Sequence, residues 1–382
     1  MIYLDNASTT QVSKNVFEAM QPYFMEKYGN PGNLHSMGLE AANAVEKARA
    51  QVAAPIHADP SEIIFTSGGS EANSLAITGL LDHLANIGRT HIVVSNVEHA
   101  SVLAAVKLAF DKGFEVTYVP VDHATGCVKP QAVIDAMRNN TGLVSVMYVN
   151  NEIGTANPID EIGYIAHMRG ALFHTDCVQA YCHKNIDVNK QYVDFLSASG
   201  HKIHAPKGIG MLYARNKSIL SPLISGSASQ EYGLRGGTEN VPYIVGFGAA
   251  AEESYANIKF FYHYMARCRM RFLCDICGQL RGVATNIISP KSNIINLRFD
   301  GVDGETLLLM LNSKGVIVSA GSACSAHEAK PSHVLKAIGL SDDEARRSIR
   351  ISFSYMTNED DVRDAARIIV ESVKALRGET NE

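Results

Sequence analysis

The chain has no tryptophan, no long apolar run and no strong excess of either charge. A membrane-spanning helix needs about 20 consecutive apolar residues, so the sequence offers no candidate span. The first residues, MIYLDNASTT, lack the basic and apolar regions of a secretory signal. The net charge of −5 and the lack of a basic stripe argue against a nucleic-acid partner. We therefore expect a cytoplasmic protein that binds neither membrane nor nucleic acid.

Cysteine is also sparse, and the seven cysteines among 382 residues form an odd and dispersed set. Such usage suits reduced thiols better than a disulfide framework. Two of them form the motif Cys274-x-x-Cys277, but this motif has no second ligand pair. The sequence therefore predicts no metal site, and a functional cysteine is expected to act as a thiol.

The residues that are present indicate an α/β protein with more than one domain, because 382 residues exceed what one compact core usually fills. From about residue 60 to 215, apolar β-branched runs alternate with helical periodicity, and several runs are apolar throughout. Such runs are typical of strands buried on both faces of a parallel sheet. We predict a mostly parallel seven-stranded sheet, with strands at 62–66, 91–95, 114–121, 143–149, 171–176, 193–199 and 210–214.

The pattern changes after about residue 255, where KSNIINLRF, GETLLLMLNSKGVIVS, RRSIRISFS and a last amphipathic helix suggest a smaller α+β unit. We expect the N-terminal arm to dock onto this unit. The predicted division is a large domain over 12–255 and a small domain formed by 1–11 and 256–382.

Ligands of open parallel sheets collect beyond the carboxyl ends of the strands, so the residues that follow each strand are candidates. After 62–66, Gly69 and Ser70 open a helix whose N–H groups could hold a phosphate. His99 follows 91–95, and Asn151 follows 143–149. Each of these, taken alone, is more often a turn residue, a cap or a satisfied core group.

Two further strand ends carry charged groups. Asp176 ends an apolar run and would enter the interior, where a carboxylate needs a partner. Lys202 lies between two apolar strands, and a desolvated lysine amine becomes a nucleophile suited to Schiff-base chemistry. The alternative for Lys202 is a surface lysine in a loop. Together, the phosphate seat, aromatic ring, carboxylate and lysine match the needs of pyridoxal phosphate.

One cysteine stands apart in the stretch VSAGSACSAHEAKPSH, where small residues surround Cys324. They offer little for a core side chain to pack against, and no second ligand lies at metal spacing. The stretch predicts a thiol carried on a mobile loop, at about 319–331, since small residues let a loop move without dragging core contacts.

Motifs along nearly the whole chain resemble those of the cysteine desulfurases, a branch of the fold type I, class V aminotransferase-like pyridoxal phosphate enzymes. In order, they are YLDNASTT, YGNPGNLHSMG, FTSGGSEANSLAI, VEHASV, VNNEIGT, HTDCVQA, SGHKIHAPKGIG, LRGGTENV, GSACS, PSHVLKAIGL and SIRIS. Their order and spacing are highly specific. Pyridoxal phosphate and iron–sulfur cluster assembly are what the resemblance implies for cofactor and pathway.

The resemblance also implies roles for single residues. Lys202 would form the Schiff base and move the substrate's α-proton, and Asp176 would pair with the pyridine nitrogen. His99 would stack on the ring and assist proton transfer. The remaining cofactor contacts would be Asn151 and Gln179 at the ring's hydroxyl side, and Gly69, Ser70, Ser199 and His201 at the phosphate.

Three residues complete the implied site. Thr238 would reach the phosphate of a neighbouring subunit, which makes the protein a homodimer. Arg350 would clamp the carboxylate of L-cysteine, for which the plain alternative is a surface ion pair. Cys324 would take the sulfur of L-cysteine as a persulfide, and L-alanine would be released. The sulfur would then pass to an acceptor such as an iron–sulfur scaffold, or to an acceptor for thiolation.

Two other functions stay open at this point. One is a selenocysteine lyase or related pyridoxal phosphate lyase on the same scaffold, and the other is a catalytically silent protein that only binds partners. Cys177, where relatives more often have alanine, is interpreted as a packing residue in preference to a sulfur relay.

Overall fold

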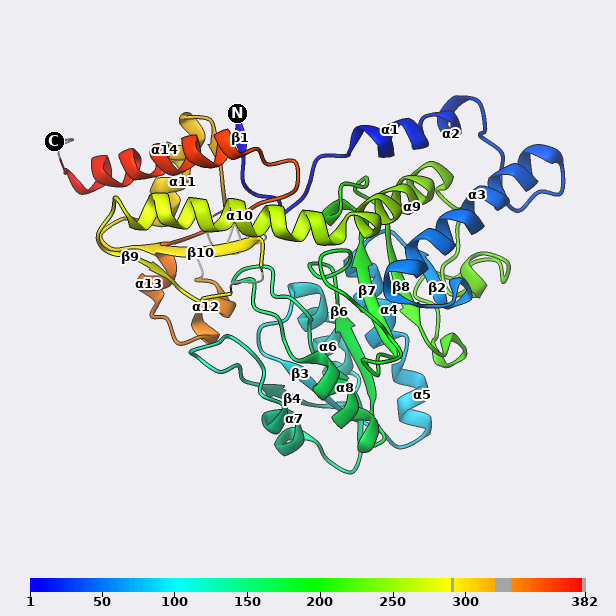
Figure 1. Ribbon diagram of the computed structural model, residues 1–382. Coiled ribbons are helices and arrows are strands. Elements are labelled where there is room, and N and C mark those ends of the chain that lie inside the picture. The colour runs from blue at the N-terminus through cyan, green and yellow to red at the C-terminus, as the bar shows by residue number, and fades with distance from the viewer. Residues whose placement is uncertain (290–291, 320–330, 380–382) are drawn as a thin grey trace.

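The computed structural model describes residues 1–289, 292–319 and 331–379 (Figure 1). Its centre is a seven-stranded sheet in the order β2-β8-β7-β6-β5-β3-β4, and β8 alone runs antiparallel to its neighbours. The strands are β2 (Ile63–Thr66), β3 (His91–Ser95), β4 (Glu115–Val119), β5 (Thr141–Ser145), β6 (Leu172–Asp176), β7 (Phe195–Ser199) and β8 (Gly210–Ala214). The mostly parallel seven-stranded sheet predicted from the apolar runs is therefore confirmed.

The predicted strand that differs most from the structure is 143–149, because β5 begins at Thr141 and ends at Ser145. The chain continues beside β6, where the N–H of Tyr148 donates a hydrogen bond to the backbone oxygen of Asp176 (3.0 Å), and then turns. The side chain of Asn150 fixes this turn by accepting hydrogen bonds from the N–H groups of Glu152 (2.9 Å) and Ile153 (3.1 Å). A side-chain turn of this kind competes with the strand ladder and ends it early.

Helices cover both faces of the sheet, and alternate residues of one strand join different hydrophobic clusters, as the strand pleat requires. Val93 belongs to the cluster shared with α3, α8 and α9, whereas Ile92 and Val94 belong to the cluster shared with α4, α5 and α6. These helices are α3 (Ser36–Ala53), α4 (Gly69–Thr78), α5 (Leu81–Asn86), α6 (Ala100–Asp111), α8 (Ile159–Met168) and α9 (Val241–Ala256), with α7 (Pro130–Ala136) beside α8.

A third hydrophobic cluster joins the N-terminal arm to the C-terminal part of the chain. Strand β1 (Ile2–Tyr3) pairs with β11 (Val316–Ile317), and Leu4 is buried in this cluster. The cluster also holds the antiparallel sheet β12-β10-β9, with long helices packed against it (Figure 1). These elements are β9 (Val283–Thr285), β10 (Ile294–Phe299), β12 (Ser348–Ser352), α10 (Ile258–Cys277), α11 (Gly304–Ser313) and α14 (Glu359–Arg377).

Short elements connect these layers. They are α1 (Lys14–Met20), α2 (Pro22–Met25), α12 (His333–Ala337), α13 (Asp342–Arg346), and the 3₁₀ turns η1 (Ala54–Ile56), η2 (Pro60–Glu62), η3 (Gly200–Lys202), η4 (Lys217–Ile219) and η5 (Glu231–Gly233). In the ranges that the structure covers, no helix has both the length and the apolar character needed to cross a membrane.

Candidate active site

The start of α4 is built for close approach by a ligand. Gly68 precedes the helix with a φ of 156°, in the region that favours glycine, and it supplies no side-chain cap to the first N–H groups. A Cβ on Gly69 would lie 2.6 Å from Cγ2 of Val178, so only glycine fits there. Uncapped N–H groups at a helix start form a seat for an anion such as a phosphate. Ser70 follows them and is exposed.

Asp176 lies at the end of β6 and is only 3% exposed. Its carboxylate accepts hydrogen bonds from Asn73 Nδ2 (2.8 Å) and from the N–H of Val178 (2.9 Å). Both donors are neutral, whereas a buried carboxylate is best stabilised by a cationic partner. A protonated pyridine nitrogen would be such a partner, so the residues present fit pyridoxal phosphate here.

His99 is the N-cap of α6, and this position fixes its ring. Nδ1 accepts a hydrogen bond from the N–H of Ser101 (3.2 Å) and lies 2.7 Å from Ser101 Oγ. A ring nitrogen that accepts from a backbone N–H carries no proton, so this hydrogen bond selects the tautomer with its proton on Nε2. Asn73 also donates to Ser101 Oγ (2.9 Å), so this hydrogen bond joins α4 to the first turn of α6.

Lys202 lies in η3, directly after β7 and its last residue, Ser199, which is buried. The Lys202 amine donates to the backbone oxygens of Ala7 (2.5 Å) and Ser8 (2.6 Å) in the N-terminal arm. Its side chain is half-buried, unlike the surface lysine that the sequence left as an alternative. Gln179 Nε2 donates to the same oxygen of Ala7 (2.8 Å), so the arm joins two predicted site residues.

His201 stands beside Lys202, and its Nδ1 lies 3.1 Å from Thr9 Oγ1. Burial lowers the pKa of His201 to about 4, and the charges of Lys202 and Lys207 add to this effect. The ring is therefore neutral at neutral pH and can donate one N–H.

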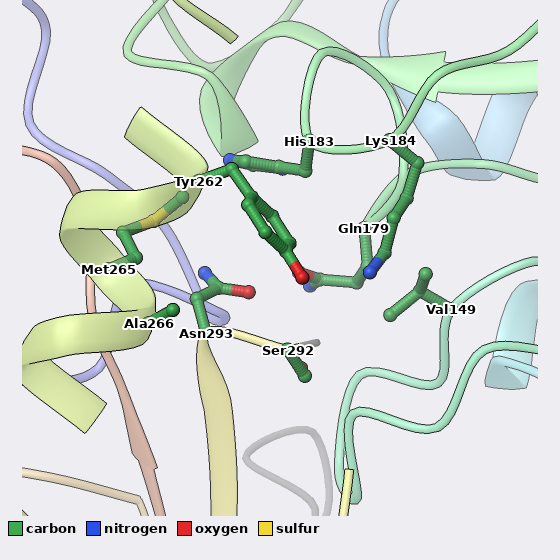
Figure 2. Close-up of a pocket in the computed structure, with 9 residues that line it drawn as sticks. All are labelled: Val149, Gln179, His183, Lys184, Tyr262, Met265, Ala266, Ser292 and Asn293. Carbon is green, nitrogen blue, oxygen red and sulfur yellow. The ribbon is translucent and has the colours of Figure 1, made fainter. Parts of the chain in front are cut away.

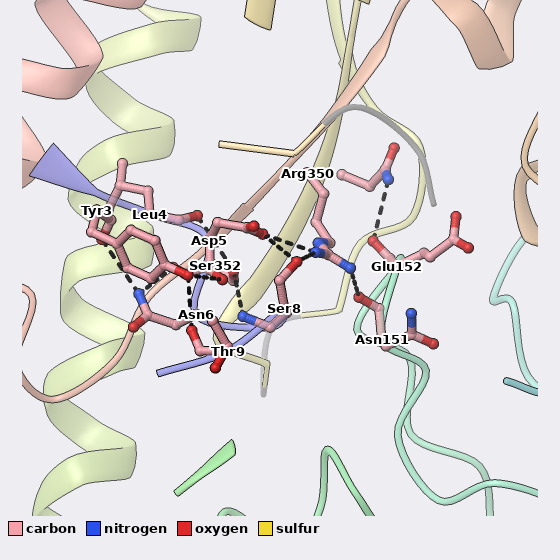
Figure 3. Close-up of polar contacts among 12 residues, drawn as sticks. Tyr3, Leu4, Asp5, Asn6, Ser8, Thr9, Asn151, Glu152, Arg350 and Ser352 are labelled. Carbon is pink, nitrogen blue, oxygen red and sulfur yellow. Dashed lines mark hydrogen bonds and ion pairs between the residues drawn. The ribbon is translucent and has the colours of Figure 1, made fainter. Parts of the chain in front are cut away.

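Arg350 lies in β12, and its side chain is only 2% exposed. Its Nη2 donates to Asp5 Oδ1 (2.9 Å) and Ser8 Oγ (2.6 Å), and its Nη1 donates to the backbone oxygen of Asn151 (2.9 Å), as Figure 3 shows. The sequence left a surface ion pair as the alternative for Arg350. Arg350 does form an ion pair, with Asp5, but its guanidinium is buried and not on the surface. Asn151 contacts Arg350 through its main chain.

The structure does not bring every predicted residue to this place. Thr238 is exposed on the segment between η5 and α9, and within the described ranges no hydrogen bond joins it to the strand ends. Cys324 and the loop predicted around it fall on 320–330, outside the described residues. Cys177 is fully buried, and this burial raises the pKa of its thiol well above the usual value. A buried neutral thiol suits packing.

Four residues of the site were missed from the sequence: Asp5, Ser8, Asn73 and Glu98. For Asn73 a signal existed, because it follows Gly69 by one helical turn and so faces the same side of α4. The two arm residues stood in the motif YLDNASTT without any role. The sequence of this arm does not show that it contacts β12, because β12 lies more than 340 positions further along the chain.

A small pocket beside Gln179 lies between α10 and the loops that follow β5 and β6 (Figure 2). Tyr262, Met265 and Ala266 line it from α10, and His183 borders it next to Tyr262. Burial lowers the pKa of His183 to about 4, helped by the charges of His204 and Lys184, so its ring is neutral.

Glu98 precedes His99 and is fully buried. Its Oε1 accepts from Ser95 Oγ (2.5 Å) and from the N–H of Met147 (2.7 Å), while Oε2 has no hydrogen-bond partner within the described parts of the chain. Burial raises the pKa of Glu98 from 4.5 to about 8, the two hydrogen bonds oppose this, and the charge of Asp176 adds to it. Glu98 is therefore mainly protonated at neutral pH.

Replacing Glu98 by glutamine is expected to reduce the loss of stability that the wild type shows as pH rises from 4.5 to about 8. The folded state keeps the proton up to about pH 8 while the unfolded state loses it near 4.5, so wild-type stability falls as pH rises through this window. Between pH 5 and 9 we expect the wild type to lose roughly 2–4 kcal/mol more than Glu98→Gln. Urea unfolding at several pH values measures this difference.

The control for that experiment is Glu18→Gln, at an exposed position on α1. Its stability should change with pH in parallel with the wild type. Parallel curves for Glu98→Gln and the wild type would show that Glu98 is ionised in the folded protein at neutral pH.

Comparisons with known proteins bear on this site. A family model described as "Aminotransferase class-V" matches residues 2–364. "Cysteine desulfurase IscS" of Methanosarcina thermophila is 42% identical over 380 residues, covering 98% of this chain and 93% of the relative. "Putative cysteine desulfurase IscS 1" of Bacillus subtilis is 43% identical over 387 residues, covering 98% and 99%.

Solved structures give the same picture. A "NIFS-LIKE PROTEIN" superposes with a TM-score of 0.91 at 34% identity, covering 98% of this chain and 99% of the other. "SspA in complex with cysteine" superposes with a TM-score of 0.81 at 38% identity, covering 92% and 99%.

Proposed function

Because this chain belongs to the aminotransferase class-V family and, within it, to the cysteine desulfurases, we propose that it takes sulfur from L-cysteine and leaves L-alanine and a persulfide on Cys324. The solved relative in complex with cysteine supports this substrate. The observation that carries the proposal is the N-terminal arm, which contacts both Lys202 and Arg350. These are the amine and the guanidinium that an amino-acid substrate requires.

We propose pyridoxal phosphate as the cofactor. Asp176, which two neutral donors hold in the described part of the chain, would pair with the ring nitrogen, and the uncapped start of α4 at Gly69 would seat the phosphate. The other residues that would hold the group are Ser70, His99, Asn151, Gln179, Ser199, His201 and Lys202. When bound, pyridoxal phosphate supplies an aldehyde for amines and a ring that accepts electrons freed at the substrate's α-carbon.

The chain's own groups perform the remaining work. Arg350 holds the substrate carboxylate through its guanidinium. The amine of Lys202 takes the proton from the α-carbon and returns a proton later, and His99 holds a proton on Nε2 next to the reacting groups. A buried site around Asp176 keeps water away from these charges.

Sulfur transfer itself needs the thiolate of Cys324, because the thiolate is the nucleophilic form. A sulfur–sulfur bond forms while the bond between the substrate's β-carbon and its sulfur breaks. The carbon then takes a proton and becomes the methyl group of L-alanine. The persulfide must next be consumed by an acceptor, for which we propose an iron–sulfur scaffold protein or a thiolation enzyme.

We further propose that the protein acts as a homodimer in the cytoplasm, with Thr238 completing the phosphate seat of its neighbour. Large apolar side chains gather on the exposed surface of residues 17–39, where a second copy would cover them. They are Phe17, Phe24, Met25, Tyr28, Leu34 and Leu39. The division into a large domain, 12–255, and a small domain of 1–11 and 256–382 is part of the same proposal.

Mapping the sulfur on the wild-type protein tests the activity. The holoprotein is incubated with L-cysteine without reductant, its thiols and persulfides are alkylated, and the peptides are identified by mass spectrometry. We expect the extra sulfur on Cys324 and one L-alanine released for each persulfide. The exposed thiols Cys274 and Cys277 are internal controls and should carry none.

Three other outcomes would contradict the proposal. Sulfur on Cys177 or elsewhere would make Cys324 the wrong acceptor. Activity on L-selenocysteine with none on L-cysteine would favour the selenocysteine lyase. A protein that binds no pyridoxal phosphate and releases no L-alanine would be a silent binding protein.

A further inference from the structure

The guanidinium of Arg350 already has a resident carboxylate beside it. Asp5 Oδ1 lies 2.9 Å from Nη2, and Ser8 Oγ accepts from the same nitrogen at 2.6 Å (Figure 3). Ser8 Oγ also donates to Asp5 Oδ1 (2.9 Å). The arm therefore presents a carboxylate and a hydroxyl to Arg350 as one connected unit.

This unit is docked on the strand that carries Arg350. Asn6 Nδ2 donates to the backbone oxygen of Ser352 (2.8 Å), and the N–H of Ala7 donates to Ser352 Oγ (2.8 Å). The N–H of Ser8 closes a turn on the oxygen of Asp5 (3.0 Å). Asp5 is thus held against Arg350 by contacts that do not involve the ion pair itself.

The donors that remain on Arg350 follow from these contacts. A guanidinium has five N–H groups. The two contacts of Nη2 use both of its hydrogens, and Nη1 spends one on Asn151 O. The buried Nε has no hydrogen-bond partner among the residues that the structure describes. A carboxylate can bind side by side to Nε and Nη2 of a guanidinium. In this structure the arm already uses Nη2 of that pair, whereas Nε is left to donate.

We propose that Asp5 is a positioning residue that sets the carboxylate affinity of Arg350. Asp5 aims the guanidinium by holding Nη2, and its negative charge opposes a second carboxylate at the same group. This inference rests on the proposed function, in which Arg350 binds the carboxylate of L-cysteine. The site would then bind its substrate and its product more weakly than a lone buried arginine would, which favours turnover over retention.

The amide variant Asp5→Asn separates charge from shape. Asparagine keeps an oxygen that can accept from Nη2, but it removes the opposing charge. We expect the dissociation constant of the holoprotein for L-alanine, measured by calorimetry, to fall by about 3- to 10-fold. The KM for L-cysteine should fall by a similar factor, while kcat changes less than KM.

The matched control is Asp364→Asn, an acid-to-amide change on the exposed face of α14. It should leave both constants unchanged. Asp5→Ala removes the acceptor as well as the charge. The guanidinium of Arg350 would then no longer be held in one orientation, so kcat should fall. If Asp5→Asn instead weakens L-alanine binding or raises KM, Asp5 has only a structural role and the inference is wrong.

A third variant keeps this result apart from the proposed function. Arg350→Gln should abolish L-alanine binding whether residue 5 is Asp or Asn. If Arg350→Gln binds L-alanine as the wild type does, Arg350 is not the carboxylate group and the proposed function fails at that residue. If Arg350→Gln loses binding but Asp5→Asn binds like the wild type, only the inference about Asp5 fails.

Discussion

Replacing Lys202 by alanine is expected to lower the rate of L-alanine and sulfide release from L-cysteine by at least about 1,000-fold. One amine is proposed to act both as the covalent anchor of the cofactor and as the base at the α-carbon, and each role alone contributes a large factor. Release of sulfide in the presence of a thiol reductant measures the rate. Borohydride reduction followed by mass spectrometry should find the cofactor attached at residue 202 of the wild type alone.

Two further variants make the outcome specific. Lys202→Arg keeps a cation that can donate to the oxygens of Ala7 and Ser8, yet it cannot form the covalent link, so it should fold normally and remain inactive. Lys207→Ala removes an exposed lysine five residues further along the same loop and should retain activity. Activity of Lys202→Ala within tenfold of the wild type would remove Lys202 from the chemistry.

The second large effect concerns a buried ion pair away from the strand ends. Arg49 of α3 and Glu231 of η5 are 5% and 3% exposed, and two hydrogen bonds of 2.9 and 2.8 Å join them. Glu231 also accepts from the N–H of Phe65 in β2 (2.7 Å). Burial lowers the pKa of Arg49, but the hydrogen bonds and charge of Glu231 outweigh it, so the pKa ends above its usual value.

The pair holds a turn that is strained. Glu231 and Tyr232 have φ values of 40° and 58°, in a backbone region that residues other than glycine rarely adopt. Each such residue costs about 1–3 kcal/mol and persists only when its surroundings impose it. The segment that carries Thr238 begins directly after this turn, so the pair also sets where that segment starts.

Replacing Glu231 by glutamine is expected to lower the free energy of unfolding by about 3–5 kcal/mol, because Arg49 then stays buried without a counter-charge. Urea unfolding of the holoprotein at fixed concentration measures the loss. Glu46→Gln is a matched control, since Glu46 pairs with the same arginine through Nε (3.1 Å) but is 64% exposed. An exposed pair contributes about 1 kcal/mol or less.

The double variant Arg49→Met with Glu231→Gln tests the cause. It removes the uncompensated charge, so we expect it to regain part of the stability that Glu231→Gln alone loses. If the single and double variants are equally unstable, the loss comes from the shape of the turn and not from the buried charge.

The sheet could be predicted from the sequence because a strand buried on both faces leaves a continuous apolar run. Strands β3 and β8 lie where the runs 91–95 and 210–214 predicted them. Strand β5 ends early because the Asn150 turn interrupts a run that stays apolar to Val149. Apolar character alone cannot distinguish a strand from a buried segment that only continues beside one.

The location of Asp176 and Lys202 beside the sheet was predictable, because Asp176 ends β6 and Lys202 lies in the short turn that follows β7. Their chemistry, a carboxylate and an amine in apolar surroundings, is visible in the linear sequence. Asp5 was not predictable, because its meaning depends on a partner in β12 that only the folded chain brings near. Its distance from Arg350 in sequence exceeds any local pattern that periodicity or capping could reveal.

That long separation has a consequence for how the protein is made. The arm is synthesised before its partners Arg350 and Ser352, which follow it by more than 340 residues. Contacts of such sequence separation form late and slowly. The large sheet can fold while synthesis continues. The contact between the arm and Arg350, however, can form only after β12 has been synthesised, so a nascent chain that stops before β12 would lack it.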